Sequence, residues 1–214
     1  MKKTLLLFIF LFLNLSGCDQ RSEDSSYQEE YPTEQETNVT TDTNLKPIIE
    51  GNHKAKIHLI VYESLTCVHC ANFHEKIYPK IKKEFVDKGI VKVEFRHFPL
   101  DLAAFNASKI AQCKNDGKAD VLNLLYLNQS KWSKGDSIEK LNSNLKKLIG
   151  DNNINLNFDK CINNKEIEDF VLNSRIEGSK KFEVNSTPTI IINNKKFDKT
   201  LDLKNLLKAI EKLI

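Results

Sequence analysis

The residues best suited to do chemistry are two cysteines in the stretch Cys67-Val68-His69-Cys70. An apolar run over residues 57–62 precedes them, and apolar residues at helical spacing follow them. A Cys-x-x-Cys between a strand and the start of a helix predicts thiol–disulfide exchange. The unpaired N–H groups and the positive dipole end of the helix favour a thiolate at Cys67. Cys70 follows about one helical turn later, close enough to form a disulfide with it.

A zinc site is the alternative reading of the same two cysteines. It would use His69 and further cysteines as additional ligands. The chain has no second Cys-x-x-Cys and no His-x-x-x-His at the usual ligand spacing. We therefore expect no metal, and we expect His58, His74 and His97 to be surface or boundary residues and His53 to be exposed.

Strand and helix patterns alternate around the Cys pair. We predict a buried strand over residues 56–62, a second strand over residues 90–98, and a short added strand at Ile48-Ile49. The helix that begins at the Cys pair is expected to run to about residue 88, with a kink at Pro79.

The second half of the chain is mainly helical. After the last predicted helix come a short strand over residues 189–192, a hairpin turn at Asn193-Asn194 and a strand that begins at residue 196. Asp202 is expected to cap a final amphipathic helix whose apolar residues continue to Ile214. Before that hairpin we predict helices over residues 103–112, 121–132, 138–149, 157–163 and 167–182.

A second motif, Ser186-Thr187-Pro188-Thr189, precedes the predicted strand at residue 189. Together with the Cys-x-His-Cys motif, it makes residues 50–214 resemble the DsbA family of disulfide oxidoreductases. This resemblance implies an α/β fold, a thioredoxin fold with an inserted α-helical domain. Residues 46–99 and 184–214 would form the thioredoxin-like domain, and residues 100–183 the insert.

The resemblance also implies roles for the site residues. Cys67 would be the exposed nucleophile and Cys70 the more buried resolving cysteine, while the ring or backbone N–H of His69 would favour the Cys67 thiolate. The peptide bond between Thr187 and Pro188 would be cis and would face the sulfurs. Thr187, Pro188 and Val68 would then bind substrate, the backbone of Thr187 pairing with an extended peptide. No cofactor is implied.

Three positions depart from the family pattern. Val68 stands where many members have proline, and Ser186 where glycine is common. Many members also have a buried acid six residues before the first cysteine, where this chain has Val61. Glu63 is close in sequence, but we expect it to point elsewhere or to replace that acid imperfectly. Because proline lowers flexibility and removes an N–H, Val68 predicts a redox potential different from that of members with proline.

Two further cysteines, Cys113 and Cys161, fall in the predicted helical insert. In an exported protein, two remaining cysteines in one domain are expected to pair. Some alphaproteobacterial DsbA relatives resemble this chain in carrying a second disulfide in the helical domain. Such a bond would close a loop of about 49 residues and contribute roughly 3–4 kcal/mol in the chain-entropy model. A structural role is favoured, and a redox-active regulatory pair is the alternative.

The first 18 residues have the pattern of an export signal, with Lys2 and Lys3 before an apolar run too short to span a bilayer. The run ends in Leu15-Ser16-Gly17-Cys18, which resembles a bacterial lipobox with Cys18 as the lipid-modified (palmitate-bearing) residue. An ordinary signal peptide is the alternative. Residues 19–45 carry a net charge of −7 and few aliphatic side chains, and this composition predicts a disordered tether.

The net charge of +8 over residues 46–214 comes from scattered lysines. This pattern indicates a solvated surface and no nucleic-acid partner. The sequence therefore predicts a periplasmic, membrane-tethered, monomeric oxidase of reduced or unfolded exported proteins. A quinone-linked membrane enzyme of the DsbB type would re-oxidise it. The alternatives are an isomerase or reductase with the same site, and a non-enzymatic surface lipoprotein whose redox site is vestigial.

Overall fold

The computed structural model describes residues 44–214. The predicted export signal, the lipidation site at Cys18 and nearly all of the acidic tether lie outside these residues, so they stay predictions. Within the part described, no helix is both long and apolar enough to cross a membrane.

A five-stranded mixed sheet forms the centre of this part of the chain. Strands β2 and β3 are parallel, with Leu59 opposite Val93, while β1 pairs antiparallel with β3 and β4 pairs antiparallel with β2. The sheet order is β1-β3-β2-β4-β5, with β1 at Ile48–Glu50, β2 at Ile57–Glu63, β3 at Val91–His97, β4 at Thr189–Ile192 and β5 at Lys195–Lys196. The predicted strands are therefore confirmed, with small shifts at their ends.

Strand β2 is buried on both faces of the sheet, since Ile60 and Tyr62 on one face are at most 3% exposed and its other face is shared with buried residues of β3. Leu59 and Val61 of β2 and Val91 and Val93 of β3 have no exposed surface. A strand covered on both sides needs apolar residues at consecutive positions, and this explains the short run of β-branched residues in the sequence.

The segment after the Cys pair is helical as far as Val86. It consists of α1 (Val68–Asn72), a π-helical turn (Phe73–Ile77), α2 (Tyr78–Ile81) and a second π-helical turn (Lys82–Val86). Pro79 has no N–H to continue the α-helical pattern. The N–H of the preceding residue, Tyr78, bonds to the carbonyl of Phe73 five positions back. The disturbance predicted at Pro79 is therefore a widened turn within one continuous helical segment.

Six helices lie between β3 and β4 in the chain. They are α3 (Leu102–Cys113), α4 (Asp120–Leu127), α5 (Gln129–Trp132), α6 (Ile138–Asp151), α7 (Phe158–Ile162) and α8 (Lys165–Phe182). The single helix predicted over residues 121–132 is wrong in one respect, because it is broken at Asn128, where ψ is 15°. The thioredoxin-type sheet with helices inserted before β4 is otherwise as predicted.

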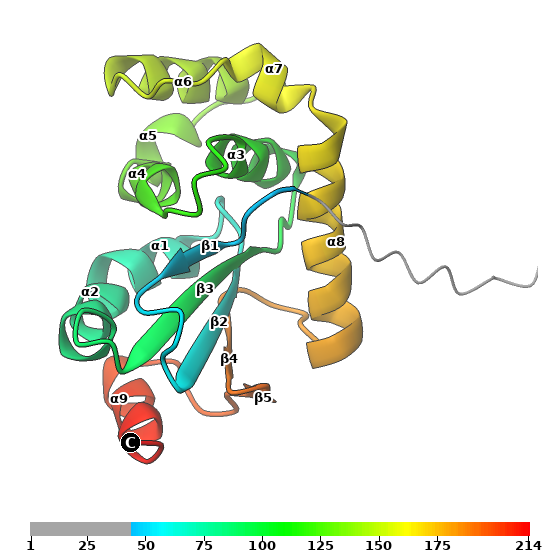
Figure 1. Ribbon diagram of the computed structural model, residues 1–214. Coiled ribbons are helices and arrows are strands. Elements are labelled where there is room, and N and C mark those ends of the chain that lie inside the picture. The colour runs from blue at the N-terminus through cyan, green and yellow to red at the C-terminus, as the bar shows by residue number, and fades with distance from the viewer. Residues whose placement is uncertain (1–43) are drawn as a thin grey trace, which may run out of the picture. The chain divides into compact units, whose positions relative to one another are not determined.

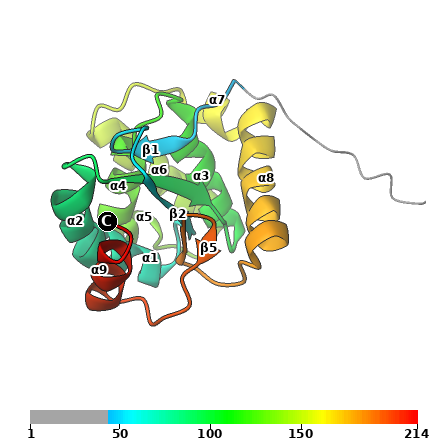
Figure 2. The ribbon, with the colours of Figure 1, turned by 60° about the horizontal axis from the view of Figure 1, so that its bottom comes forward.

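The two faces of the sheet are covered by different helices. Helix α8 runs along one side, and α2 and α9 (Leu203–Glu211) lie on the other, in both views (Figures 1 and 2). On the α8 side, the ring of Tyr62 packs where Gly178 leaves room for it. A Cβ atom at Gly178 would lie 2.7 Å from the Tyr62 ring, so this close approach requires glycine.

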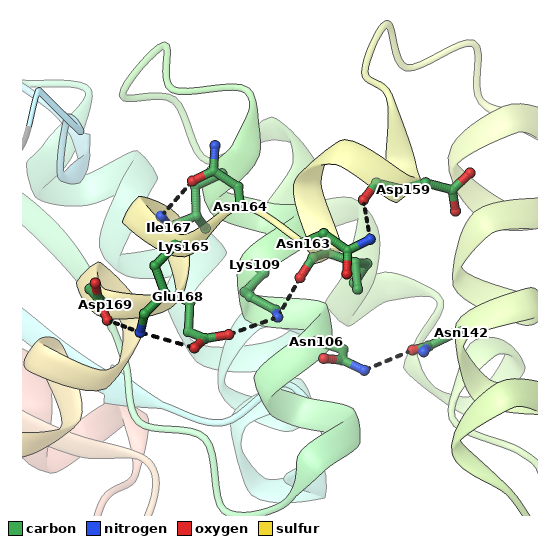
Figure 3. A network of polar contacts seen from close by, with 11 residues as sticks. Asn106, Lys109, Asn142, Asp159, Asn163, Asn164, Lys165, Ile167, Glu168 and Asp169 are labelled. Atoms are coloured by element: carbon green, nitrogen blue, oxygen red, sulfur yellow. Dashed lines mark hydrogen bonds and ion pairs between the residues drawn. The ribbon is translucent and has the colours of Figure 1, made fainter.

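The inserted helices are joined to one another by a disulfide and a buried lysine. Cys113 at the end of α3 is bonded to Cys161 in α7, with 5.6 Å between their Cα atoms. One turn earlier on α3, Lys109 is only 4% exposed. Its Nζ donates to the carbonyl of Ile162 at 2.5 Å and lies 3.5 Å from a carboxylate oxygen of Glu168 (Figure 3). The predicted pairing of the two cysteines is therefore present, and Lys109 binds α3 to α7 and α8.

The last helix is shorter than the sequence pattern indicates. Asp202 caps it as predicted, because its side chain accepts from the backbone N–H of Asn205 at 2.8 Å. Leu206 and Ile210 are buried. The prediction that the apolar face continues to the C-terminus is wrong, since the helix ends at Glu211 and Ile214 is 72% exposed.

Candidate active site

Cys67 lies between the end of β2 and the beginning of α1. The backbone N–H of Cys67 bonds to the carbonyl of Ser64 at 3.0 Å, which closes a tight turn after the strand. Cys67 has an extended backbone conformation and occupies the N-cap position. The sulfur is therefore placed where the free N–H groups of the helix converge, an arrangement that stabilises negative charge.

The pKa of Cys67 is lowered to about 5. The largest cause is a hydrogen bond from the Cys70 thiol. Burial opposes the shift, and the side chain of Thr187 and the backbone N–H groups of Cys70 and His69 add to it. The predicted contribution of His69 therefore comes from its backbone. The side chain of His69 is exposed, and among the described residues its ring has no recorded hydrogen bond.

Cys70 has the opposite environment. Its side chain is completely buried, and this burial raises the pKa of its thiol far above the ordinary range, helped by the hydrogen bond to Cys67 and by the charge of Glu63. The two cysteines are free thiols in this structure. One sulfur is thus suited to be a thiolate and the other to hold a proton.

The Thr-Pro loop faces the first cysteine, as the motif predicts. The peptide bond between Thr187 and Pro188 is cis. The Cys67 thiol donates to the carbonyl oxygen of Thr187 at 3.3 Å. The Thr189 hydroxyl donates to the Ser186 carbonyl at 2.7 Å and closes the turn before β4. Residues separated by 120 positions in the chain therefore form one site.

Glu63 is close to the dithiol, and the expectation that it points elsewhere is wrong. It ends β2, is 2% exposed, and its Oε2 lies 2.7 Å from Nε2 of His74. Burial is the largest cause that raises the pKa of Glu63, and the charge of Cys67 adds to it. Its other oxygen, Oε1, is buried without a hydrogen bond of ordinary geometry in the described residues, and the nearby Tyr126 hydroxyl opposes the rise in the pKa. An acid does therefore lie beside the Cys pair, two positions later than the family pattern indicates.

His74 is also different from its predicted surface or boundary position. It is 6% exposed, and its ring stacks on Tyr126 of α4 with 4.1 Å between centroids. Its Nδ1 lies 3.1 Å from Oδ1 of Asn123, which is also on α4. Its place one helical turn after Cys70 was the available signal, because residues four apart share a helix face.

His97 and His58 make no contact with the dithiol in the part of the chain that the structure describes. His97 is buried, which lowers its pKa to about 4, and its Nε2 lies 3.3 Å from Oε1 of Gln112. His58 forms an ion pair with Glu94 at 2.9 Å. Over residues 44–214, no three His, Cys, Asp or Glu side chains are arranged to hold a metal ion.

The surface beside Cys67 carries exposed apolar side chains. Val68 is 63% exposed, and Leu100 and Leu102 after β3 are about half exposed. A groove of about 460 Å³ begins at Thr66 and continues between the start of α3 and the loop before α6. Thr66 donates to Asp101 at its rim, at 2.6 Å. This surface is wide and partly apolar, features typical of a site for extended peptides.

Comparison with known proteins agrees with this geometry. A family model described as thioredoxin matches residues 43–212. The crystal structure of Wolbachia pipientis alpha-DsbA1 is similar with a TM-score of 0.70 and 30% identity, covering 78% of this chain and 90% of that one. Disulfide bond formation protein D of Bacillus subtilis is 27% identical over 177 residues, which is 78% of this chain and 76% of that protein.

A protein from Rickettsia conorii that is named as a protein-disulfide oxidoreductase is 25% identical over 177 residues. The match covers 82% of this chain and 63% of that relative, so the chain spans less than two thirds of its length. The family match, the sheet with its helical insertion and the Cys-x-x-Cys opposite a cis proline lead to one assignment. The chain belongs to the thioredoxin family, in its DsbA-like group of disulfide oxidoreductases.

Proposed function

We propose that this protein is an exported oxidase that introduces disulfide bonds into other proteins through Cys67 and Cys70. The observation that carries the proposal is the contrast between the two sulfurs. Hydrogen bonds at a helix N-terminus favour a thiolate at Cys67, whereas Cys70 is buried and holds its proton. A stabilised thiolate favours the reduced enzyme, so the Cys67–Cys70 disulfide is a strong oxidant.

The first step is attack by a substrate thiolate on the sulfur of Cys67. A bond forms between the two sulfurs, the Cys67–Cys70 bond breaks, and its electron pair leaves on Cys70. Because a buried thiolate is unfavourable, Cys70 takes up a proton. The pair formed by Glu63 and His74 supports this proton transfer, since it is buried beside Cys70.

The second step releases the oxidised substrate. A second substrate thiolate attacks the substrate sulfur of the mixed disulfide, and Cys67 leaves as a stabilised thiolate. Two substrate thiols thus become a disulfide, and the enzyme keeps two electrons as its dithiol. A quinone-linked membrane partner would accept these electrons and restore the enzyme disulfide.

Substrates would be reduced or unfolded exported proteins. The backbone of Thr187, beside the cis bond, can pair with an extended peptide as an added strand. The exposed side chains of Val68, Leu100 and Leu102 would contact the apolar residues that an unfolded chain exposes. These contacts use backbone and apolar surface, so they favour broad over narrow selectivity.

The proposed location is the periplasm, on a lipid anchor at Cys18. The support is the sequence pattern of Lys2, Lys3, the apolar run and the lipobox-like ending. Metabolic labelling with palmitate should mark the wild-type protein in its native host and leave Cys18→Ser unlabelled. Equal labelling of both proteins would refute the anchor.

The oxidase proposal is tested by mixing the oxidised protein with a reduced model protein that has several disulfides. We expect stoichiometric formation of substrate disulfides and a reduction potential in the range of strong oxidants. Cys67→Ser should be inactive, and Cys70→Ser should accumulate a mixed disulfide. Efficient repair of scrambled disulfides without net oxidation would instead establish an isomerase.

A further inference from the structure

His74, in the π-helical turn, lies at the centre of a partly buried network of polar side chains that come from four further elements. Its Nε2 is 2.7 Å from Glu63 of β2, and its Nδ1 is 3.1 Å from Oδ1 of Asn123 on α4. Nδ2 of Asn123 donates to Oε1 of Glu50 on β1 at 3.4 Å. Tyr78 of α2 donates to the other oxygen of Glu50 at 2.5 Å. These hydrogen-bonded side chains therefore extend from the dithiol to the edge strand β1 of the sheet.

Glu50 determines which way the Asn123 amide faces. An ionised carboxylate only accepts hydrogen bonds, so it requires the NH₂ group of Asn123 on its side. Reversing the amide would place the Asn123 oxygen against a Glu50 oxygen, two acceptors without a proton between them. Tyr78 holds the carboxylate in position from its other oxygen. The amide oxygen of Asn123 must then face His74.

An oxygen acceptor at Nδ1 of His74 requires a proton on that nitrogen. We infer that Asn123 and Glu50 are positioning residues that fix the proton of His74 on Nδ1, so that Nε2 is the nitrogen that exchanges a proton with Glu63. The Asn123 oxygen at Nδ1 cannot take up or release a proton, whereas the Glu63 carboxyl at Nε2 can do both. Proton exchange is thus restricted to the side that faces the dithiol.

This restriction deepens the proposed function and rests on it. When Cys70 leaves as a thiolate, one proton passes from the Glu63–His74 pair to its sulfur. When Cys70 next attacks a mixed disulfide, its proton returns to the pair, so protons and charge balance over the cycle. Oε1 of Glu63 makes no hydrogen bond of ordinary geometry within the described residues, and the buried Tyr126 hydroxyl interacts with both the Glu63 carboxyl and the Cys70 thiol, so these groups lie together where the proton is exchanged. A buried unpaired carboxylate oxygen is costly for stability, and this points to a functional role.

Several titratable groups lie around the pair formed by Glu63 and His74. Their titration also contributes to the pH profile of the enzyme. Tyr126 stacks on His74 and its hydroxyl is buried. Lys82 lies 3.8 Å from Glu50 at the outer end of the network, and the neighbouring ring from β3 is the apolar Phe95. The facing groups are Glu50 of β1, Glu63 of β2, Cys67 and Cys70 at α1, Tyr78 of α2 and Tyr126 of α4.

The direct test is the nitrogen spectrum of His74 in the full-length, ¹⁵N-histidine-labelled protein. Long-range ¹H–¹⁵N correlations distinguish a protonated ring nitrogen from a bare one. We expect a protonated Nδ1 in the reduced and in the oxidised protein, with redox-dependent change confined to Nε2. A bare Nδ1 in either redox state would overturn the inference. This measurement stands even if the protein proves not to oxidise substrates.

Two substitutions at the same position separate positioning from packing. Asn123→Leu keeps the shape but removes the acceptor, whereas Asn123→Asp keeps an oxygen at Nδ1. Asn123→Leu should slow reduction of the enzyme disulfide by a dithiol peptide about tenfold and change the pH profile of that rate. Asn123→Asp also sets an acceptor oxygen against Glu50, so its rate should fall too, but its ¹⁵N spectrum should still show a protonated Nδ1 on His74, a preference that Asn123→Leu should lose.

The matched control is Asn142→Leu, which removes one side-chain hydrogen bond with Asn106 at 3.1 Å in the inserted helices (Figure 3). It should lose similar stability while the rate and pH profile stay unchanged. A bare Nδ1 in Asn123→Asp, or a wild-type pH profile in Asn123→Leu, would refute the inference. If Asn123→Leu does not fold, the wild-type nitrogen spectrum decides.

Discussion

Gln129 of α5 donates from one amide nitrogen to the backbone carbonyls of both Leu65 and Cys67, at 2.8 and 3.0 Å. The side chain is 7% exposed. The loop that carries the reactive sulfur is therefore held by the inserted helices as well as by the sheet. Neither motif in the sequence indicates this contact.

Replacing Gln129 by Met should loosen that loop, because two backbone carbonyls lose their donor. We expect the free energy of unfolding to fall by about 2 kcal/mol and substrate oxidation to slow several-fold. Gln112→Met is the matched control, since buried Gln112 donates to one carbonyl, that of Lys46, at 2.8 Å. Urea titrations and oxidation rates on both variants check this. A rate loss in the control as large as that in Gln129→Met would show a general packing effect.

The stability of the reduced protein should depend on pH through Cys67. Its pKa is about 5 in the folded protein and about 8.5 in an unfolded chain. A lowered pKa stabilises the folded state fully above the unfolded value, and this stabilisation is lost as the pH falls through 5. The oxidised protein lacks the effect because it has no thiol at this position.

We therefore expect the unfolding free energy of the reduced form, relative to the oxidised form, to rise by about 2–3 kcal/mol between pH 5 and 8.5, allowing for solvent screening of a half-buried sulfur. Denaturant titrations of both redox forms across this range measure it. Cys67→Ser cannot form the disulfide, and its unfolding free energy, measured against that of the oxidised wild type, should show no such rise. A flat difference in the wild type would contradict the thiolate assignment.

Glu63→Gln should separate activity from stability. The amide cannot take up a proton, so the steps at Cys70 should slow by about a hundredfold. Burial raises the pKa of Glu63 in the folded protein. A group with a raised pKa stabilises the folded state at low pH, and this stabilisation is lost as the pH rises through the pKa of the folded protein. The variant lacks this loss, so its stability relative to the wild type should increase above about pH 4.3. Unchanged kinetics would exclude Glu63 from the proton transfer.

The disulfide between Cys113 and Cys161 should act on stability alone. It encloses a sequence separation of 48 residues, so Cys113→Ala/Cys161→Ala should lower the unfolding free energy by about 4 kcal/mol in the chain-entropy model. Lys109 still binds α3 to α7 in this variant, so the fold should persist. The thiolate absorbance titration of Cys67 should not change. A shifted titration would instead support the regulatory role.

Local patterns in the sequence predict much of the fold and the sulfur chemistry. Consecutive β-branched residues mark the buried strands, and the Thr-Pro motif before β4 matches the cis bond opposite Cys67. Each of these features depends on a short stretch of sequence, and the structure that such a stretch adopts is largely independent of the rest of the chain. The pairing of Cys113 with Cys161 could be predicted because few partners were available.

The proton-handling side chains could not be predicted in the same way. Glu63 and His74 are ordinary residues until the end of β2 and the helix after Cys70 are placed under α4. Tyr126 and Asn123 then exclude solvent and fix the imidazole. Their effect arises from contacts between residues up to 73 positions apart, and local periodicity carries no record of such contacts. The break at Asn128 was missed because its neighbours are good helix formers.

The long separation between Cys67 and Thr187 has a consequence for how the protein is made. The Cys pair leaves the ribosome or the export channel well before β4, which must return across the sheet to pair with β2. Contacts of such high sequence separation form late in folding. Until then the carbonyl of Thr187 is not beside the sulfur, and the peptide-binding edge is incomplete. The site around Cys67 is therefore assembled in the last stage of the chain's own maturation, so the same long-range pairing that completes the sheet also sets the time at which this site is complete.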